Sequence, residues 1–263
     1  MKIKCAKDEI LEGLQIVQSI VSGKGTLPIL SNVLLETCEG ELVLTTTDLE
    51  VGMRKRVKAK IIKEGAITLP AKRLLAILRE LPVSEVVMEA SDQKEVTIMY
   101  DASYFKVLGL PKDEFPPLPD FRKNRSLKVP QGAMGEMIRK THYAVSHDES
   151  RYVLNGLYLM LSKGCITAVA TDGRRLALCE IAAAVPEGID RGIIVPTKAV
   201  LELGRILGAE GDVELFLGEN QVAFSRDDCS LVTRLIEGHF PNYQQVVPQR
   251  SEHKLIQIGR AHV

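Results

Sequence analysis

Two stretches decide the fold, Thr47-Asp48-Leu49-Glu50 and Thr171-Asp172-Gly173-Arg174. The second repeats the Thr-Asp pair of the first after 124 residues. The pair Phe115-Pro116 likewise returns as Phe240-Pro241 after 125 residues. Solenoid repeats recur at roughly 20 to 50 residues, so a unit this long is a whole domain copied in tandem. The chain is therefore predicted to hold two related domains, and such a duplication suits a symmetric or ring-like object.

Length and composition fit this organisation. The chain has 263 residues, 45% of them hydrophobic and 26% charged, as in soluble proteins with two domains. It starts without an apolar signal segment and has no run near the roughly 20 apolar residues that span a bilayer, so we expect a cytoplasmic protein without a membrane partner. Five cysteines without a C-x-x-C pair argue against disulfides and zinc. Because the net charge is zero, any nucleic-acid binding would depend on where the charges lie.

The hydrophobic pattern predicts the order βαβββ twice in each half of the chain. In the first half, strands are expected at residues 2–6, 32–37, 41–47, 51–60, 66–69, 85–90, 94–100 and 103–110, with helices from residue 8 to Gly23 and from Pro70 to Pro82. In the second half, strands are expected at 127–129, 152–161, 165–171, 175–181, 193–195, 213–217, 221–225 and 231–237, with helices after Pro130 and at 197–207. A proline-rich linker at 115–119 separates domain 1 (residues 1–122) from domain 2 (residues 123–253).

Six motifs occur in one order along the chain. They are Thr26-Leu27-Pro28-Ile29-Leu30-Ser31-Asn32, Thr47-Asp48-Leu49-Glu50, Val153-Leu154-Asn155-Gly156, Ala170-Thr171-Asp172-Gly173-Arg174-Arg175-Leu176-Ala177, Ile194-Val195-Pro196-Thr197-Lys198 and Gly238-His239-Phe240-Pro241-Asn242-Tyr243. Taken together, these motifs resemble the β sliding clamp family of bacterial DNA polymerase III.

The resemblance implies an α+β DNA-clamp fold, in which each tandem domain is a duplicated βαβββ unit with helices on the inner face and sheets outside. It implies a non-catalytic processivity factor that encircles duplex DNA as a head-to-tail homodimer of three-domain subunits. The implied partners are the DNA polymerase III catalytic subunit, the clamp loader, and other polymerases and repair proteins that carry clamp-binding motifs. The resemblance stops after Leu255, so we expect a fragment without the third domain, a non-native tail at 254–263, and a monomer or a loosely associating species.

By resemblance, basic side chains of the inner helices and nearby residues face duplex DNA without reading its sequence. The matching residues are Lys24, Lys72, Arg73, Arg79, Arg139, Lys140, Tyr152, Lys198 and Arg205. From the residues alone, an ordinary solvated helix face is an open alternative, and acidic residues even make the first helix net negative. A sliding protein needs only a modest positive lining. Gly23-Lys24-Gly25-Thr26 is not expected to bind nucleotide, because a helix precedes it and Gly25 occupies the hydroxyl position of a phosphate loop.

By the same resemblance, domain 2 supplies a hydrophobic groove for short linear peptides of partner proteins. The matching residues are Leu154, Thr171, Gly173, Arg174, Arg175, Leu176, Pro241, Gln245 and Val246. From the residues alone, the stretch around Asp172 is a plain turn, since one carboxylate without a second carboxylate or His nearby builds neither a metal site nor a catalytic site.

The resemblance also places Ile77, Leu81, Phe105 and Val107 at a subunit contact, with interior packing as the open alternative. No catalytic constellation, metal site or cofactor motif stands out in the sequence. The alternative function from another class is a small-molecule or nucleotide-handling enzyme on a duplicated α+β domain.

Overall fold

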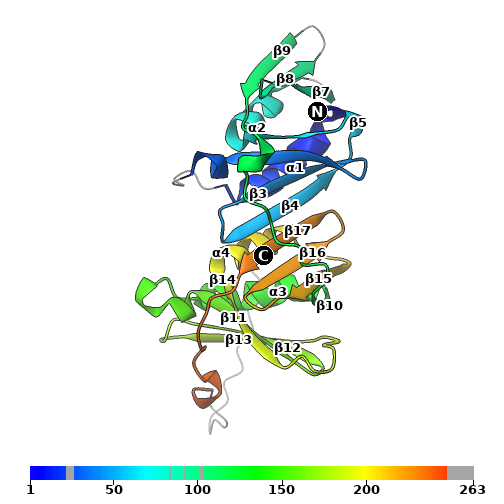
Figure 1. The fold of residues 1–263 in the computed structure, drawn as a ribbon. Helices are drawn as coiled ribbons and strands as arrows, with labels where there is room; N and C mark the ends of the chain where they lie inside the picture. The colour runs from blue at the N-terminus through cyan, green and yellow to red at the C-terminus, as the bar shows by residue number, and fades with distance from the viewer. Residues whose placement is uncertain (22–26, 83, 92, 101–102, 248–263) are drawn as a thin grey trace, which may run out of the picture.

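The computed structural model describes residues 1–21, 27–82, 84–91, 93–100 and 103–247 (Figure 1). Domain 1 contains β1 Lys2–Ala6, α1 Lys7–Gln18, β2 Asn32–Cys38, β3 Glu41–Thr47, β4 Val51–Val57, β5 Lys60–Lys63, β6 Ala66–Pro70, α2 Ala71–Glu80, β7 Glu85–Ala90, β8 Glu95–Tyr100 and β9 Ser103–Leu108. Domain 2 contains β10 Arg125–Pro130, α3 Gln131–Thr141, β11 Gly156–Ser162, β12 Cys165–Thr171, β13 Leu176–Ala182, β14 Arg191–Pro196, α4 Thr197–Ile206, β15 Asp212–Leu217, β16 Gln221–Arg226 and β17 Cys229–Arg234. The expected order of helices and strands is therefore present in both domains.

Several predicted boundaries are wrong. The first helix ends at Gln18 and not at Gly23, and the expected strand 103–110 ends at Leu108. The expected strand 51–60 is two strands, because the chain leaves the central sheet after β4 and β5 pairs with β1 instead. The first residues of the expected strand 152–161 form a 3-10 helix, η4 Glu149–Leu154, which Asp148 caps by accepting a hydrogen bond from the amide of Ser150. The expected strand 231–237 ends at Arg234.

A central eight-stranded sheet joins the two domains (Figure 1). Its order is β10-β15-β16-β17-β4-β3-β2-β6, so the seam lies between β17 of domain 2 and β4 of domain 1. The two strands pair antiparallel, with Val232 opposite Gly52 and Leu231 opposite Met53. Each domain adds an outer sheet, β5-β1-β7-β8-β9 in domain 1 and β13-β12-β11-β14 in domain 2. Main-chain hydrogen bonds therefore connect the domains directly.

The helices lie in a row against these sheets. α1 packs on β3 and β4 and α4 packs on β17, so both cover the same face of the central sheet. α2 packs against α1 and α3 packs against α4, which gives the order α2, α1, α4, α3. The prolines Pro70, Pro130 and Pro196 precede α2, α3 and α4, and most apolar side chains of these helices are buried. We call this arrangement the helix row.

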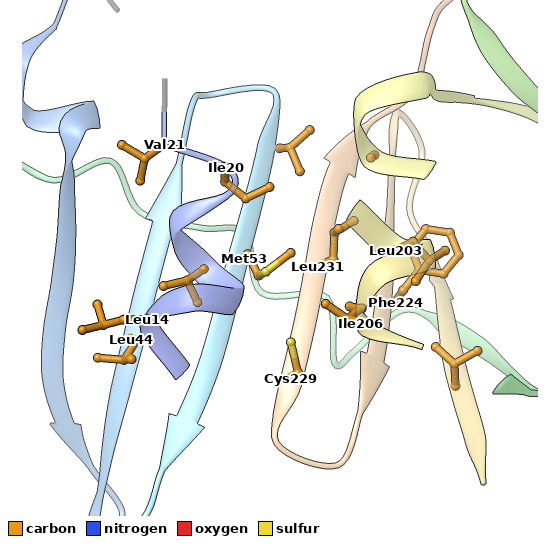
Figure 2. Packing of buried hydrophobic residues seen from close by; sticks show 14 of the residues in the cluster. Leu14, Ile20, Val21, Leu44, Met53, Leu203, Ile206, Phe224, Cys229 and Leu231 are labelled. Carbon is orange, nitrogen blue, oxygen red and sulfur yellow. The ribbon is translucent and has the colours of Figure 1, made fainter. Parts of the chain in front are cut away.

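The hydrophobic core continues across the seam (Figure 2). Met53 of β4 and Leu231 of β17 are both fully buried and lie between Leu14 of α1 and Leu203 of α4. Because burial of one such side chain contributes roughly 1.5 to 3 kcal/mol, this contact holds the row together as well as the sheet.

Candidate functional site

The helix row exposes cations mainly at its two ends. The exposed cations are Lys72, Arg73 and Arg79 on α2, Arg139 and Lys140 on α3, and Arg205 on α4. Between these ends, α1 exposes the acidic residues Asp8, Glu9 and Glu12. Lys140 donates to Glu136 at 2.7 Å, and this hydrogen bond holds the pKa of the Glu136 carboxyl below its usual range. The row therefore presents an interrupted positive surface and no continuous basic stripe.

The remaining DNA-binding candidates lie elsewhere. Tyr152 is in η4, with 58% of its surface exposed, beside the peptide-groove candidate Leu154. Lys24 lies outside the described residues.

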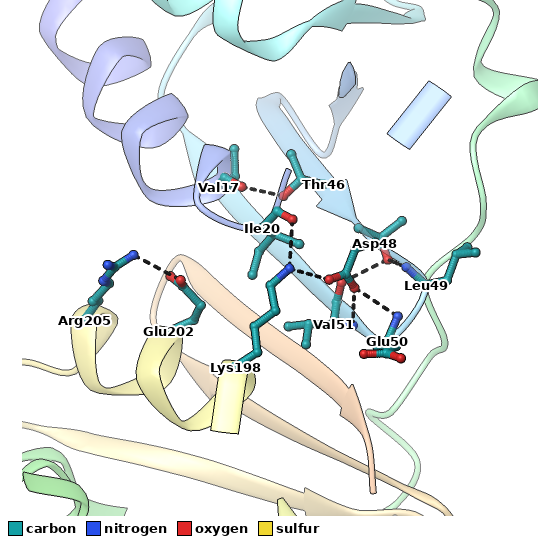
Figure 3. Close-up of polar contacts among 11 residues, drawn as sticks. Val17, Ile20, Thr46, Asp48, Leu49, Glu50, Val51, Lys198, Glu202 and Arg205 are labelled. Atoms are coloured by element: carbon teal, nitrogen blue, oxygen red, sulfur yellow. Dashed lines mark hydrogen bonds and ion pairs between the residues drawn. The ribbon is translucent and has the colours of Figure 1, made fainter. Parts of the chain in front are cut away.

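Lys198 connects the two domains (Figure 3). From the first turn of α4 its ammonium group forms an ion pair with Asp48 and donates to the carbonyl oxygen of Ile20 at 3.3 Å. Its side chain is 41% exposed, and that of Asp48 only 13%. The structure thus gives Lys198 a partner inside the molecule that its assignment as a DNA-facing cation did not anticipate.

The repeated Thr-Asp pairs form the same turn twice. In the first Thr-Asp turn, the Asp48 carboxylate accepts from the amides of Glu50 at 3.0 Å and Val51 at 2.7 Å. The Thr47 hydroxyl accepts from the amide of Leu49 at 3.0 Å and donates to the carbonyl oxygen of Val51 at 3.0 Å. The third residue, Leu49, has a φ of 80°, a conformation that costs a non-glycine residue roughly 1 to 2 kcal/mol.

The second Thr-Asp turn brings five predicted groove residues together. Asp172 accepts from the amides of Arg174 and Arg175 at 2.9 and 3.0 Å, and these bonds hold the pKa of the Asp172 carboxyl below its usual range. Thr171 accepts from the amide of Gly173 and donates to the carbonyl oxygen of Arg175. Leu176 pairs with Thr171 across β12 and β13.

This second turn has neighbours that sequence reasoning did not name. The guanidinium of Arg175 lies 5.7 Å from the centre of the Tyr143 ring. Gly173 has a φ of 85°, and a Cβ there would lie 2.8 Å from the guanidinium of Arg151 in η4. The turn is therefore packed against the segment that carries Leu154, which is itself buried.

The other three groove candidates, Pro241, Gln245 and Val246, lie in the segment 240–247 and are exposed. This segment is fixed on the outer sheet of domain 2 by aromatic contacts, since the rings of Phe240 and Tyr158 stack at 4.7 Å. Beside it is a hollow of about 440 Å³ that contains none of the nine predicted groove residues. Its lining consists of Met160, Ser162, Thr167, Leu178, Glu180, Tyr243, Gln244 and Val247. The outward alternation of strand β11 is the signal that could have pointed to Tyr158 and Met160.

The predicted subunit contact needs correction. Leu81 and Val107 are only 3% and 1% exposed and belong to the core of domain 1, so they cannot offer surface to a second subunit. Ile77 is half-buried against the same core, whereas Phe105 is 41% exposed. Phe105 and Val107 are two residues apart and point to the same face of β9, so the core covers this face at Val107 but leaves it open at Phe105.

Other kinds of site find little support. Among the described residues, no three His, Cys, Asp or Glu side chains gather in a way that could hold a metal ion. Burial raises the pKa of the Cys5 thiol to about 12 and that of the Cys229 thiol to about 11, so both are poor nucleophiles. No helix of the described part of the chain is long and apolar enough to cross a bilayer.

Comparison with known proteins identifies the family. The family model described as DNA polymerase III beta subunit, N-terminal domain, matches residues 1–119, and the one described as its central domain matches residues 128–242. The chain is 34% identical over 255 residues to the beta sliding clamp of Chlamydia pneumoniae, a match that covers 97% of this chain and 70% of that protein. The chain belongs to the beta sliding clamp family.

Solved structures agree with this membership. The sliding clamp of Bacillus subtilis superposes with a TM-score of 0.92 at 28% identity, covering 95% of this chain and 68% of that one. The clamp of Caulobacter crescentus gives 0.87 at 35% identity, covering 95% and 69%. The predicted family and α+β clamp fold are confirmed. The chain is thus a DNA polymerase III processivity factor of a non-catalytic family, and the alternative of a nucleotide-handling enzyme is wrong.

Proposed function

We propose that the helix row is the surface that faces duplex DNA. The observation that carries this proposal is the row itself, because helices of both domains lie side by side and expose six cations. Interrupted positive charge suits a protein that must hold phosphates and still slide, since each added phosphate contact strengthens binding and increases its salt dependence. Phosphate contacts of this kind position a protein on the duplex without reading its sequence.

Two unrelated duplexes of equal length test this part of the proposal. In a competition experiment at low salt, each should displace the other at the same concentration, because contacts to phosphates carry no sequence information. A tenfold preference for either duplex would contradict the assignment.

We further propose that the second Thr-Asp turn, with Leu154 and the segment 240–247, receives linear peptides of the polymerase and of other partners. The support is that the turn presents Leu176 and Arg175 on a rigid hydrogen-bonded frame beside an aromatic surface. By family membership, we expect these partners to include the polymerase III catalytic subunit, the clamp loader and repair proteins. We expect a head-to-tail dimer for the full-length protein and a monomer or a loosely associating species for this chain.

A fluorescent peptide with leucine and phenylalanine at its apolar end tests the groove. Leu176→Asp should weaken binding at least about tenfold, because it places a charge where an apolar side chain must be buried. Leu201→Asp is the matched control, since Leu201 is an exposed leucine of α4 away from the turn. Equal binding by wild type and Leu176→Asp would refute the groove assignment.

A further inference from the structure

A second hollow lies at the junction of the two domains. Its volume is about 520 Å³, and we call it the junction hollow. Domain 1 contributes the first Thr-Asp turn, domain 2 contributes β16 and β17, and the linker passes along it. The lining consists of Thr47, Leu49, Glu50, Gly52, Pro116, Pro117, Leu118, Pro119, Gln221, Val232, Thr233 and Arg234.

The internal repeat relates this hollow to the proposed peptide groove. An offset of 124 residues takes Thr47, Leu49, Glu50 and Gly52 to Thr171, Gly173, Arg174 and Leu176. An offset of 125 residues takes Pro116 to Pro241. Five lining residues of the junction hollow thus correspond to five predicted residues of the groove. The correspondence also holds in three dimensions, because the two Thr-Asp turns have the same four hydrogen bonds and the same positive φ at their third residue.

The chain itself shows what such a hollow can hold. Leu118 of the linker lies directly over Gly52, where an added Cβ would come within 2.3 Å of its side chain. Leu118 also packs on the cluster that contains Val232, and Phe121 follows with its ring centre 5.0 Å from that of Phe216. The surrounding prolines favour an extended backbone. An extended segment with an aliphatic side chain therefore already occupies one part of the hollow.

We propose that the junction hollow is a second peptide site, which takes an extended segment with a leucine in the place of Leu118. The inference rests on the proposed function of the second Thr-Asp turn, because it extends that role to the other copy of the turn. Leu49, 49% exposed, provides apolar surface at the rim, and Glu50 and Arg234 provide opposite charges there. In the resting chain, the linker occupies the site and competes with any peptide from outside.

This competition sets the expected size of the effect. A short tether gives its own ligand an effective concentration on the order of millimolar. A free peptide should therefore bind the wild-type chain weakly, and removal of the tethered side chain by Leu118→Ala should strengthen binding at least about tenfold. The probe is a labelled peptide with the chain's own sequence at 115–121, and the same peptide with alanine in place of its leucine is the control.

Three variants of the whole chain distinguish the two sites by fluorescence anisotropy. The peptide should bind the single variant Leu118→Ala. It should bind the double variant Leu118→Ala and Leu176→Asp equally well, because Leu176 belongs to the groove of domain 2. It should not bind the double variant Leu118→Ala and Leu49→Asp. Leu49 is exposed, so its replacement should leave the fold intact, and thermal melting checks this. Amide shifts of Val232 and Thr233 in NMR spectra provide a second measurement that does not depend on any variant.

The outcomes separate the two assignments. If Leu176→Asp abolishes binding and Leu49→Asp does not, the peptide uses only the groove of domain 2, which overturns this inference and leaves the proposed function standing. If the peptide binds no variant and moves neither amide, the inference also fails, while the groove remains open to its own test with the leucine and phenylalanine peptide. Equal binding of the alanine control peptide would likewise overturn it.

Discussion

The ion pair between Asp48 and Lys198 should stabilise the domain junction, and a double-mutant cycle measures how much. Asp48→Asn removes the charge but keeps an oxygen that can accept from the amides of Glu50 and Val51. Lys198→Met removes the ammonium group and keeps most of the aliphatic side chain. The two substitutions therefore isolate the interaction with little damage to the turn or to α4.

The exposures of the two side chains set the magnitude. Fully exposed ion pairs contribute roughly 0.2 to 1 kcal/mol, and hydrogen bonds to charged groups inside proteins roughly 1.5 to 3 kcal/mol. With 13% of the Asp48 side chain and 41% of the Lys198 side chain exposed, the pair lies between these cases. We expect a coupling free energy of about 1 kcal/mol, smaller at 1 M salt because the screening length falls to about 3 Å.

Urea unfolding of the four proteins provides the coupling free energy. The pair Asp172 and Arg175 is a matched control, because Asp172 has the position of Asp48 in the second turn but its partner lies three residues away in the same domain, at 3.1 Å. The Asp172→Asn and Arg175→Met cycle should give less than half the coupling of the junction pair. A junction coupling below about 0.3 kcal/mol, or equal to that of the control, would refute the role of Lys198 as a connector of the domains.

Two further predictions follow from the backbone and from burial. Positions 49 and 173 both have positive φ, which glycine adopts more readily than leucine. In thermal melts, Leu49→Gly should therefore leave the free energy of unfolding unchanged or raise it, and Gly173→Leu should lower it by more than about 1 kcal/mol. A larger loss for Leu49→Gly than for Gly173→Leu would contradict this. A thiol reagent should label the exposed Cys38 in the folded chain before Cys5 and Cys229. Burial raises the pKa of these two thiols above the ordinary 9.0, so their contribution to stability is complete below pH 9 and should be lost between pH 9 and about 11 to 12. An alkaline unfolding curve without a loss of stability in that range would contradict this prediction.

Local pattern predicted most of the fold. Pro70 followed by leucines at helical spacing sufficed for α2, and the turn around Asp172 was predicted from its residues. The pattern could not place contacts between distant parts of the chain. Lys198 meets Asp48 across 150 residues, and no local signal distinguishes such a lysine from one on a solvated helix face.

The same limit applies to the candidate site. The second Thr-Asp turn is local and was predicted, whereas the stacking of Phe240 on Tyr158 depends on how the chain returns over the outer sheet. The resemblance placed Val107 at a subunit contact with interior packing as the alternative, and the sequence could not decide between them because strand alternation does not tell which face is covered.

The dependence of DNA binding on salt tests the DNA-facing role of the helix row most directly. The measurement compares the wild-type chain with the double variant Arg73→Glu and Arg139→Glu, which reverses one charge at each end of the row. The control variant is Lys163→Glu, because the Lys163 side chain is 85% exposed and lies on the turn between β11 and β12. The logarithm of the wild-type binding constant should fall linearly with the logarithm of the salt concentration, and the double variant should lose about 2 from the slope, roughly 0.9 for each phosphate contact. Lys163→Glu should keep the wild-type slope. An unchanged slope in the double variant, or an equal loss in Lys163→Glu, would contradict the assignment of the helix row to DNA.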